Sequence, residues 1–149
     1  MAPQHKEQFA GPMAWRGDEI TKEDISVDLS AKQVAALEDV LARVSKAGLS
    51  LREITAEQVR HPALDSTLEK VFDEIQHGRG IVILRGFPVD GHSVEEVGKM
   101  YWAVGAHFGR GVSQSALGDL LGQVQDETPP GKAESARGYL SRRELSLHN

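Results

Sequence analysis

The chain has 149 residues, a formal net charge of −5 and no cysteine. This length suits one domain with a buried core, and the absence of thiols excludes disulfides, thiolate catalysis and cysteine zinc sites. The acidic balance argues against a nucleic-acid-binding surface, and no apolar run approaches the roughly 20 residues of a membrane span. The N-terminus does not resemble a secretory signal. We therefore expect a cytoplasmic protein that binds neither nucleic acid nor membrane.

Residues 1–28 contain prolines and glycines but no sustained hydrophobic period. They predict an N-terminal arm that lies on the domain, anchored by Phe9 and Trp15, or alternatively a partly disordered tail. Residues 29–149 are predicted to form a single domain.

Three amphipathic helices are predicted within that domain. Capping boxes at Ser30–Gln33 and Ser93–Glu96 begin the first and third, and Gly48 and Gly78 end the first and second. A further box at Thr55 predicts one short turn, and the third helix is expected to end near Gly105. The side chains expected to face the core are Val34, Leu37, Leu41 and Val44, then Leu64, Leu68, Val71, Phe72 and Ile75, then Val94, Val97, Tyr101 and Val104.

The strands are predicted to be fewer and shorter. The apolar run Ile81–Leu84, bracketed by glycines, is typical of a strand that is buried on both faces. A second strand is expected at Leu120–Val124, and a long polar loop at 127–138. After that loop Leu145 and Leu147 alternate with polar residues, which predicts a last strand ending at His148. The fold class is therefore α+β.

Several common chemistries have no support in the sequence. The tripeptide "GRG" occurs at 78–80 and 109–111, but both copies follow a predicted helix. A dinucleotide fingerprint needs the opposite order, with glycines before the helix, so both are interpreted as helix ends. The nucleophile elbow G-x-S-x-G of serine hydrolases is also absent.

The six histidines offer no pair at the i, i+4 spacing of a helical metal site. His61, His77 and His92 are interpreted as structural or solvated. His107 either lines a cleft or is a partly buried, hydrogen-bonded side chain. His148 ends an alternating strand after a polar loop; taken alone, it is either exposed to solvent or a ligand of a site.

The order of three segments carries a family resemblance. "GRGIVILRGFPVD", then "YWAVGAHFGRGVSQSALGDLLGQVQDE", then "RGYLSRRELSLHN" resembles the N-terminal half of the taurine dioxygenase-like (TauD/TfdA) family. These are non-haem Fe(II)/2-oxoglutarate-dependent oxygenases. The resemblance is good over residues 78–149 and plausible over the helices before them. It implies the N-terminal part of a double-stranded β-helix, a jelly roll with outer helices, whose sheet is incomplete here.

The resemblance also implies a metal site. His148 matches the first histidine of the family's His-x-Asp motif and Asn149 its variable middle position, so the aspartate would be residue 150. The distal histidine and the arginine that holds 2-oxoglutarate also lie downstream in the family. Gln114 and Tyr139 are candidate substrate-pocket residues, and Asp126 lies on a stretch that approaches the active-site mouth. Two histidines and one carboxylate would hold Fe(II) on one face, leaving positions open for 2-oxoglutarate and oxygen.

Two hypotheses about function follow from the sequence. In the first, the chain is an N-terminal fragment of an Fe(II)/2-oxoglutarate dioxygenase that hydroxylates or otherwise oxidises a small molecule, inactive alone because most of the metal triad is missing. In the second, it is a non-catalytic α/β module that binds a protein partner or self-associates. A missing half supplied by another chain is less favoured, because a jelly roll split within its sheet exposes an unpaired edge.

Overall fold

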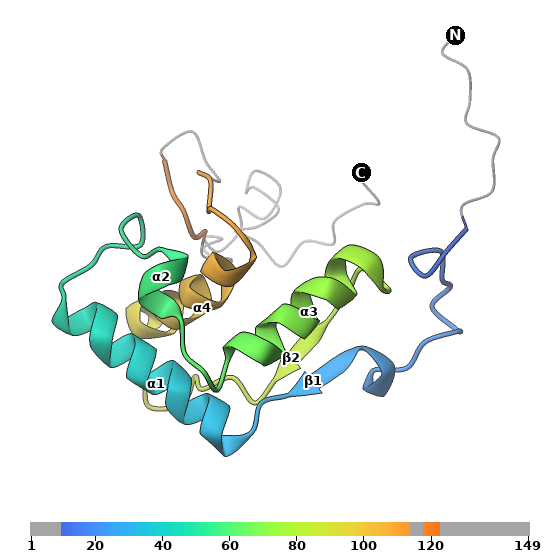
Figure 1. Cartoon of the computed structure of the whole chain (residues 1–149), viewed down its shortest axis with the longest axis horizontal. Coiled ribbons are helices and arrows are strands. Elements are labelled where there is room, and N and C mark those ends of the chain that lie inside the picture. The colour runs from blue at the N-terminus through green and yellow to red at the C-terminus, as the bar shows by residue number, and fades with distance from the viewer. Residues whose placement is uncertain (1–9, 114–117, 123–149) are drawn as a thin grey trace, which may run out of the picture. The chain divides into compact units, whose positions relative to one another are not determined.

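The computed structural model of the protein describes residues 10–113 and 118–122, and the chain divides into two units after Gly111. The first unit contains every helix and strand of the described residues (Figure 1). The described residues of the second unit form neither. In chain order the elements are the 3₁₀ helix η1 (Glu23–Ile25), β1 (Ser26–Asp28), α1 (Ala31–Lys46), α2 (Ala56–Val59), α3 (Asp65–His77), β2 (Ile83–Arg85) and α4 (Val94–Phe108).

The predicted capping boxes begin the helices. At α1, the Ser30 amide donates to Gln33 Oε1 at 2.8 Å while the Gln33 amide donates to Ser30 Oγ at 3.4 Å. Ser93 and Glu96 make the same exchange at α4, at 2.8 and 3.3 Å. At the short helix α2 the Thr55 amide donates to Gln58 Oε1 at 2.7 Å. Each exchange satisfies amide groups that a helix N-terminus leaves without partners.

The carboxylate in the α4 cap makes helix stability depend on pH. Hydrogen bonds from the backbone and then the hydroxyl of Ser93 lower the pKa of Glu96 below its usual 4.5, although partial desolvation opposes them. A lowered carboxyl pKa stabilises the fold at neutral pH, and this contribution is lost as the pH falls below 4.5 through the pKa of the folded state. We expect Glu96→Gln to keep the cap, as Gln33 does in α1, and to reduce the loss of unfolding free energy measured between neutral and acidic pH. An unchanged loss would contradict this role.

Gly48 ends α1 with a left-handed residue, as predicted. Its φ is +66°. The Leu49 amide donates to the Val44 carbonyl at 3.1 Å and the Gly48 amide to the Ser45 carbonyl at 3.0 Å, the two bonds of a Schellman motif. A Cβ at Gly48 would meet no atom within 4 Å, so the backbone conformation alone selects glycine here.

This end gives a matched pair of substitutions. Gly48→Ala is expected to lower the free energy of unfolding by about 1 kcal/mol, because an L-residue is strained at positive φ. Gly105→Ala, inside α4 and equally free of neighbours, is expected to raise it by about 0.5–1 kcal/mol through helix propensity. Urea unfolding of both variants measures the pair. Equal effects of the same sign would show that the α1 end is not specified by backbone conformation.

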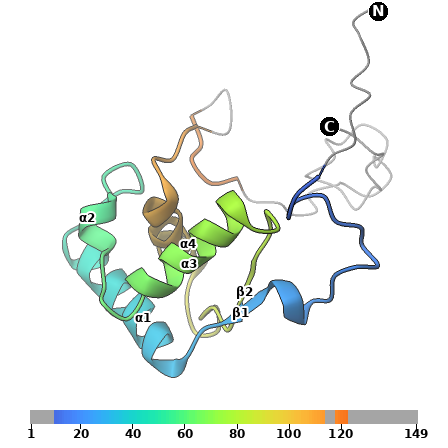
Figure 2. The ribbon, with the colours of Figure 1, turned by 45° about the vertical axis from the view of Figure 1, so that its right-hand side comes forward.

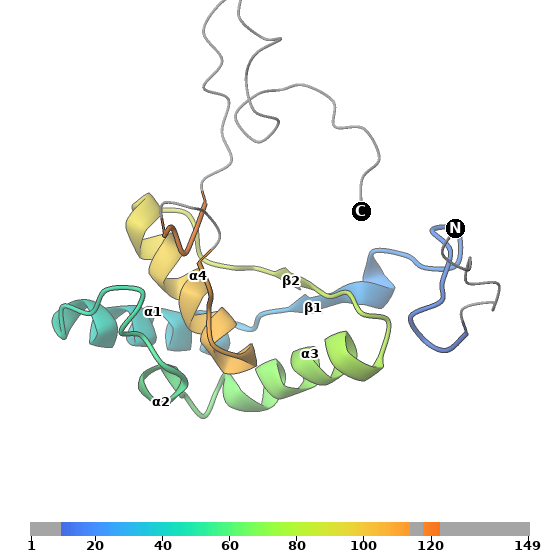
Figure 3. The same cartoon turned by 90° about the horizontal axis from the view of Figure 1, so that it is seen from above.

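The core lies where α1, α2 and α3 meet α4, and α4 contacts all three (Figures 2 and 3). The predicted faces of α1 and α3 supply part of it, namely Leu37, Leu41, Val44, Leu64 and Leu68. The fully buried side chains are Leu37, Val40, Val44, Val59, Leu64, Leu68 and Met100. The prediction for Phe72 was wrong: this side chain is 38% exposed and stacks on Phe108 at the edge of the core.

The inward face of α4 also differs from the prediction. Met100 and Ala103 are buried, whereas Val94 and Tyr101 are 69% and 64% exposed. The reason is that α4 carries apolar residues around most of its circumference, so more than one apolar stripe has helical spacing. The helix also continues past Gly105 and ends with Gly109 as its C-cap.

The sheet has two strands in the described part of the chain. β1 pairs with β2 in parallel, with Ser26 opposite Ile83 and Asp28 opposite Arg85 (Figure 1). β1 was not predicted and lies at the end of the expected arm. The prediction that the Ile81–Leu84 run is buried on both faces was wrong, because Ile83 is exposed and no buried residue falls in the run. In the part of the chain that the structure describes, β2 has a strand on one side only, so its other edge stays open.

The arm contacts the turn between α3 and β2. The Trp15 indole Nε1 donates to the Arg79 carbonyl at 2.8 Å, and Met13 lies where a Cβ on Gly80 would touch it. Arg79 in turn reaches the Asp24 carbonyl at 3.4 Å. Trp15 therefore anchors the arm, as predicted, through its hydrogen bond to Arg79. Phe9, the other predicted anchor, lies outside the described residues.

The remaining strand predictions have different outcomes. The structure describes residues 120–122 of the strand expected at Leu120–Val124. Leu120 and Leu121 form a bend, after Gly118 with its φ of +88°, so the prediction of a strand is wrong for these residues. The polar loop 127–138 and the last strand lie outside the described residues. The jelly roll depends on strands in those segments and beyond, so it stays a prediction.

Candidate functional site

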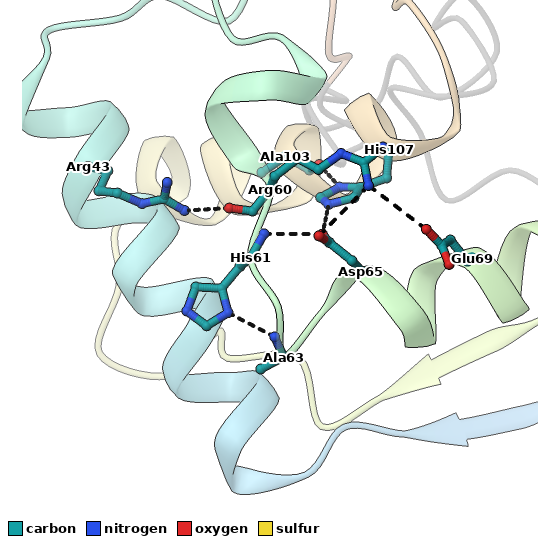
Figure 4. A network of polar contacts seen from close by, with 8 residues as sticks. All are labelled: Arg43, Arg60, His61, Ala63, Asp65, Glu69, Ala103 and His107. Atoms are coloured by element: carbon teal, nitrogen blue, oxygen red, sulfur yellow. Dashed lines mark hydrogen bonds and ion pairs between the residues drawn. The ribbon is translucent and has the colours of Figure 1, made fainter.

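A cluster of polar side chains surrounds His107 near the end of α4 (Figure 4). We call His107, Asp65, Arg60, His61 and Glu69 the His107 cluster. The His107 side chain is 8% exposed. Its Nδ1–H donates to the Ala103 carbonyl at 2.8 Å, and its Nε2 lies 3.4 Å from Asp65 Oδ1. Both ring nitrogens face oxygen acceptors, so only the doubly protonated imidazolium can donate to both.

Asp65 connects His107 to the segment between α2 and α3. Its Oδ1 accepts from the His61 amide at 3.1 Å, and its Oδ2 lies 3.8 Å from Arg60 Nη1. Arg60 also lies 3.8 Å from Glu69 Oε1, and the Arg60 carbonyl accepts from Arg43 Nη2 at 3.1 Å (Figure 4). One carboxylate at the start of α3 therefore holds the end of α4 and the α2–α3 connection together.

The geometry assigns His107 a structural role. Its ring nitrogens are occupied, and every buried side-chain N or O atom among the described residues has a partner. Of the two interpretations of His107, the partly buried, hydrogen-bonded side chain is therefore confirmed. His92 acts similarly, because its Nε2 lies 2.8 Å from Glu38 Oε1 and joins the start of α4 to α1. The interpretation of His61, His77 and His92 as structural or solvated is confirmed as well.

Removing the His107 ring tests this role. His107→Ala is expected to lower the free energy of unfolding by about 1–3 kcal/mol, because a side chain that is only 8% exposed loses its contacts with the Ala103 carbonyl and the Asp65 carboxylate. His77→Ala is the control: its exposed ring pairs only with Asp73 at 3.0 Å, so a change within about 0.5 kcal/mol is expected. Thermal or urea unfolding at neutral pH measures both. If both substitutions change the free energy of unfolding by the same small amount, the His107 cluster does not stabilise the fold.

No metal site forms within residues 10–113 and 118–122, because no three histidine, aspartate or glutamate side chains there are grouped to hold an ion. The predicted ligand His148, the candidate pocket residues Gln114 and Tyr139, and Asp126 all lie outside the described residues. No described helix has the length and apolar character to cross a membrane.

His107 stood out in the sequence, but its partner Asp65 and the neighbouring Arg60 did not. Neither belongs to a motif, because the contact of Asp65 with His107 depends on how α3 packs on α4, and Arg60 reaches Asp65 and Glu69 from the segment before α3. The one signal available was the position of Asp65 in the first turn of a helix, where a carboxylate is favourable in any protein.

Comparison with known proteins gives a partial likeness. No family model matches the sequence. The chain is 26% identical over 119 residues to a protein named FR-33289 synthase from Streptomyces rubellomurinus (strain ATCC 31215). The alignment covers 77% of this chain and 34% of that protein, so the chain spans about a third of the length of the curated relative that it matches. By its name, that relative is a synthase, a biosynthetic enzyme.

Proposed function

We propose that residues 1–149 correspond to the N-terminal part of an Fe(II)/2-oxoglutarate-dependent oxygenase that oxidises a small molecule. The observation that carries the proposal is the ordered set of segments that resembles the taurine dioxygenase-like family, from "GRGIVILRGFPVD" to "RGYLSRRELSLHN". The likeness to a synthase over 77% of the chain supports an enzyme that modifies a small molecule. The coverage of only 34% of that relative supports a part of a larger catalytic unit.

The described residues do not themselves fit an iron site, so we assign them no step of the reaction. In this proposal His148 is the first metal ligand, and the carboxylate and second histidine come from sequence beyond the 149 residues printed above. When bound, Fe(II) and 2-oxoglutarate would supply the oxidation, with 2-oxoglutarate converted to succinate. One imidazole alone is not expected to retain Fe(II), which stands low in the affinity series of divalent metals.

The supporting role of the described helices is to hold the chain that leads into the candidate site. The His107 cluster fixes the end of α4 against α3, just before the glycine-rich stretch at 109–113 that precedes Gln114. Gly111 lies so close to Trp102 of α4 that a Cβ there would overlap the indole ring. The second "GRG" is therefore the end of α4, and the close contact of Gly111 with Trp102 explains the glycine without a bound phosphate.

Two observations test the proposal together. Purified 1–149 with Fe(II), 2-oxoglutarate and oxygen is expected to form no succinate above a control without protein. The reading frame after Asn149 is expected to continue with an aspartate codon and, further on, a histidine. Succinate from the 149-residue chain would refute the claim that the metal triad is completed elsewhere. A stop codon directly after Asn149 would favour the alternative, a non-catalytic module that binds a partner or self-associates.

A further inference from the structure

The first "GRG" forms the turn that follows α3, and its arginine contacts the N-terminal arm at two points. The Arg79 carbonyl accepts from the Trp15 indole Nε1 at 2.8 Å, and Arg79 Nη1 donates to the Asp24 carbonyl at 3.4 Å. The part of the arm between Trp15 and Asp24 is therefore a loop that is closed on one residue. We call Gly78, Arg79 and Gly80 the docking turn.

The surroundings of the docking turn explain both of its glycines. A Cβ on Gly78 would overlap the Glu74 carboxylate, which accepts from the Arg79 amide at 3.0 Å. Gly80 has a φ of +78°, a conformation that favours glycine, and a Cβ there would lie 3.6 Å from Cγ of Met13 in the arm. The turn is therefore held from the side of α3 by Glu74, and it meets the arm through Arg79 and Gly80.

The arm itself is attached largely by polar contacts. No residue from 10 to 28 is buried, and the side chains of Trp15 and Met13 are 36% and 53% exposed. The hydrogen bond of the Arg16 amide to Glu19 Oε2, at 2.8 Å, joins neighbours within the arm and does not tie it to the helices. A segment with few buried apolar contacts opens at a lower free-energy cost than a packed core.

The arm and the docking turn both lead directly into the parallel strand pair. On one side η1 and β1 follow the arm, and on the other β2 begins soon after Gly80. Ser26 of β1 lies opposite Ile83 of β2, and beyond the strands the Leu29 amide donates to the Arg85 carbonyl at 2.9 Å. The hydrogen bonds of the docking turn therefore continue those of the sheet, so a change that releases the arm also loosens the start of β2.

We propose that the docking turn is the intramolecular binding site of the N-terminal arm, and that arm and turn open and close as one unit, separately from the helical core. The arm is then a strap that is fastened at Arg79. Coupling between two sites is reciprocal, so weakening the contact from the arm loosens the turn, and straining the turn releases the arm. The proposal uses only described residues of the first unit and does not depend on the proposed oxygenase function.

Amide hydrogen exchange of the 149-residue chain, followed by mass spectrometry, tests the coupling from the side of the arm. Trp15→Phe keeps an aromatic ring and removes the indole donor. The amides of residues 78–85 are expected to exchange about 2- to 10-fold faster, the factor for one lost hydrogen bond, while those of α1 are unchanged. Arg16→Ala is the matched control, because its side chain pairs with Asp18 inside the arm, and unchanged exchange is expected. No acceleration in Trp15→Phe, or equal acceleration in α1, would overturn the proposal.

Limited trypsin digestion tests the coupling from the side of the turn, because Lys22 is a cleavage site in the arm. Gly80→Ala is strained at positive φ and is expected to speed cleavage after Lys22 several-fold, since proteolysis follows the population of the open form. Gly91→Ala is the matched control: its φ is +82° and a Cβ there meets no atom within 4 Å, so cleavage after Lys22 is expected at the rate of the unsubstituted chain. An unchanged rate in Gly80→Ala, or an equal increase in both variants, would overturn the proposal.

Discussion

Replacing Met100 with alanine is expected to lower the free energy of unfolding by about 2–5 kcal/mol, the range for truncating a buried large side chain. Met100 has no exposed surface, and it lies on the side of α4 that α1, α2 and α3 cover. Its removal costs the transfer free energy of the side chain and leaves a cavity that a close-packed core fills only in part. A small domain has a total stability of only about 5–15 kcal/mol, so this variant would be largely unfolded at modest urea concentrations.

The neighbouring residue supplies the control. Tyr101→Ala is expected to change the free energy of unfolding of the dilute chain by less than about 0.5 kcal/mol, because the ring is 64% exposed. The two substitutions are at adjacent positions of α4. Comparing their effects therefore shows which face of the helix packs against the core. A larger loss for Tyr101→Ala than for Met100→Ala would mean that the apolar stripe of the sequence analysis faces the core and that the α4 packing described above is incorrect.

Replacing His148 with alanine is expected to have the largest effect on function. In the protein produced from the complete reading frame, we expect His148→Ala to weaken Fe(II) binding by at least about 100-fold, because even residues that only support metal ligands change affinity by 10–100-fold. Equilibrium titration with Fe(II) under nitrogen measures this effect. The proposal depends on this result because His148 is the only ligand of the expected triad that the 149 residues contain.

Two further variants separate a lost ligand from a damaged fold. His77→Ala removes an exposed histidine from the end of α3 and is expected to leave Fe(II) affinity unchanged. His107→Ala weakens the core, so an accompanying loss of metal affinity is expected to scale with the unfolded fraction. If His148→Ala binds Fe(II) with full affinity, His148 is not a metal ligand.

Local signals in the sequence predicted the helices well. Ser30 and Ser93 specify helix starts through hydrogen bonds to residues three positions later, and Gly48 specifies an end through its own backbone conformation. These features involve only near neighbours in the chain, so no knowledge of packing is needed to recognise them.

Features that depend on packing were not predicted. The inward face of α4 was misassigned because apolar residues surround most of the helix, and only its neighbours determine which of them are buried. β1 was missed because Ser26–Asp28 is short and acquires strand structure only by pairing with β2. The side-chain partner of His107, Asp65, lies 42 residues away in the sequence, a separation that no spacing rule covers.

The candidate metal site was predicted from a family resemblance and not from the spacing of residues. No spacing among the described histidines and carboxylates predicts a metal centre, and none forms there. His148, Gln114 and Tyr139 were identified by resemblance alone, and they lie outside the described residues. Their roles therefore depend on sequence that completes the motif, and direct measurement of ligand binding is required.

Calorimetric titration of 2-oxoglutarate into the protein from the complete reading frame, with and without Fe(II) under nitrogen, tests the central claim most directly. We predict stoichiometric binding that requires Fe(II), and no such binding by the 149-residue chain under the same conditions. Absence of 2-oxoglutarate binding to the complete protein in the presence of Fe(II) would contradict it.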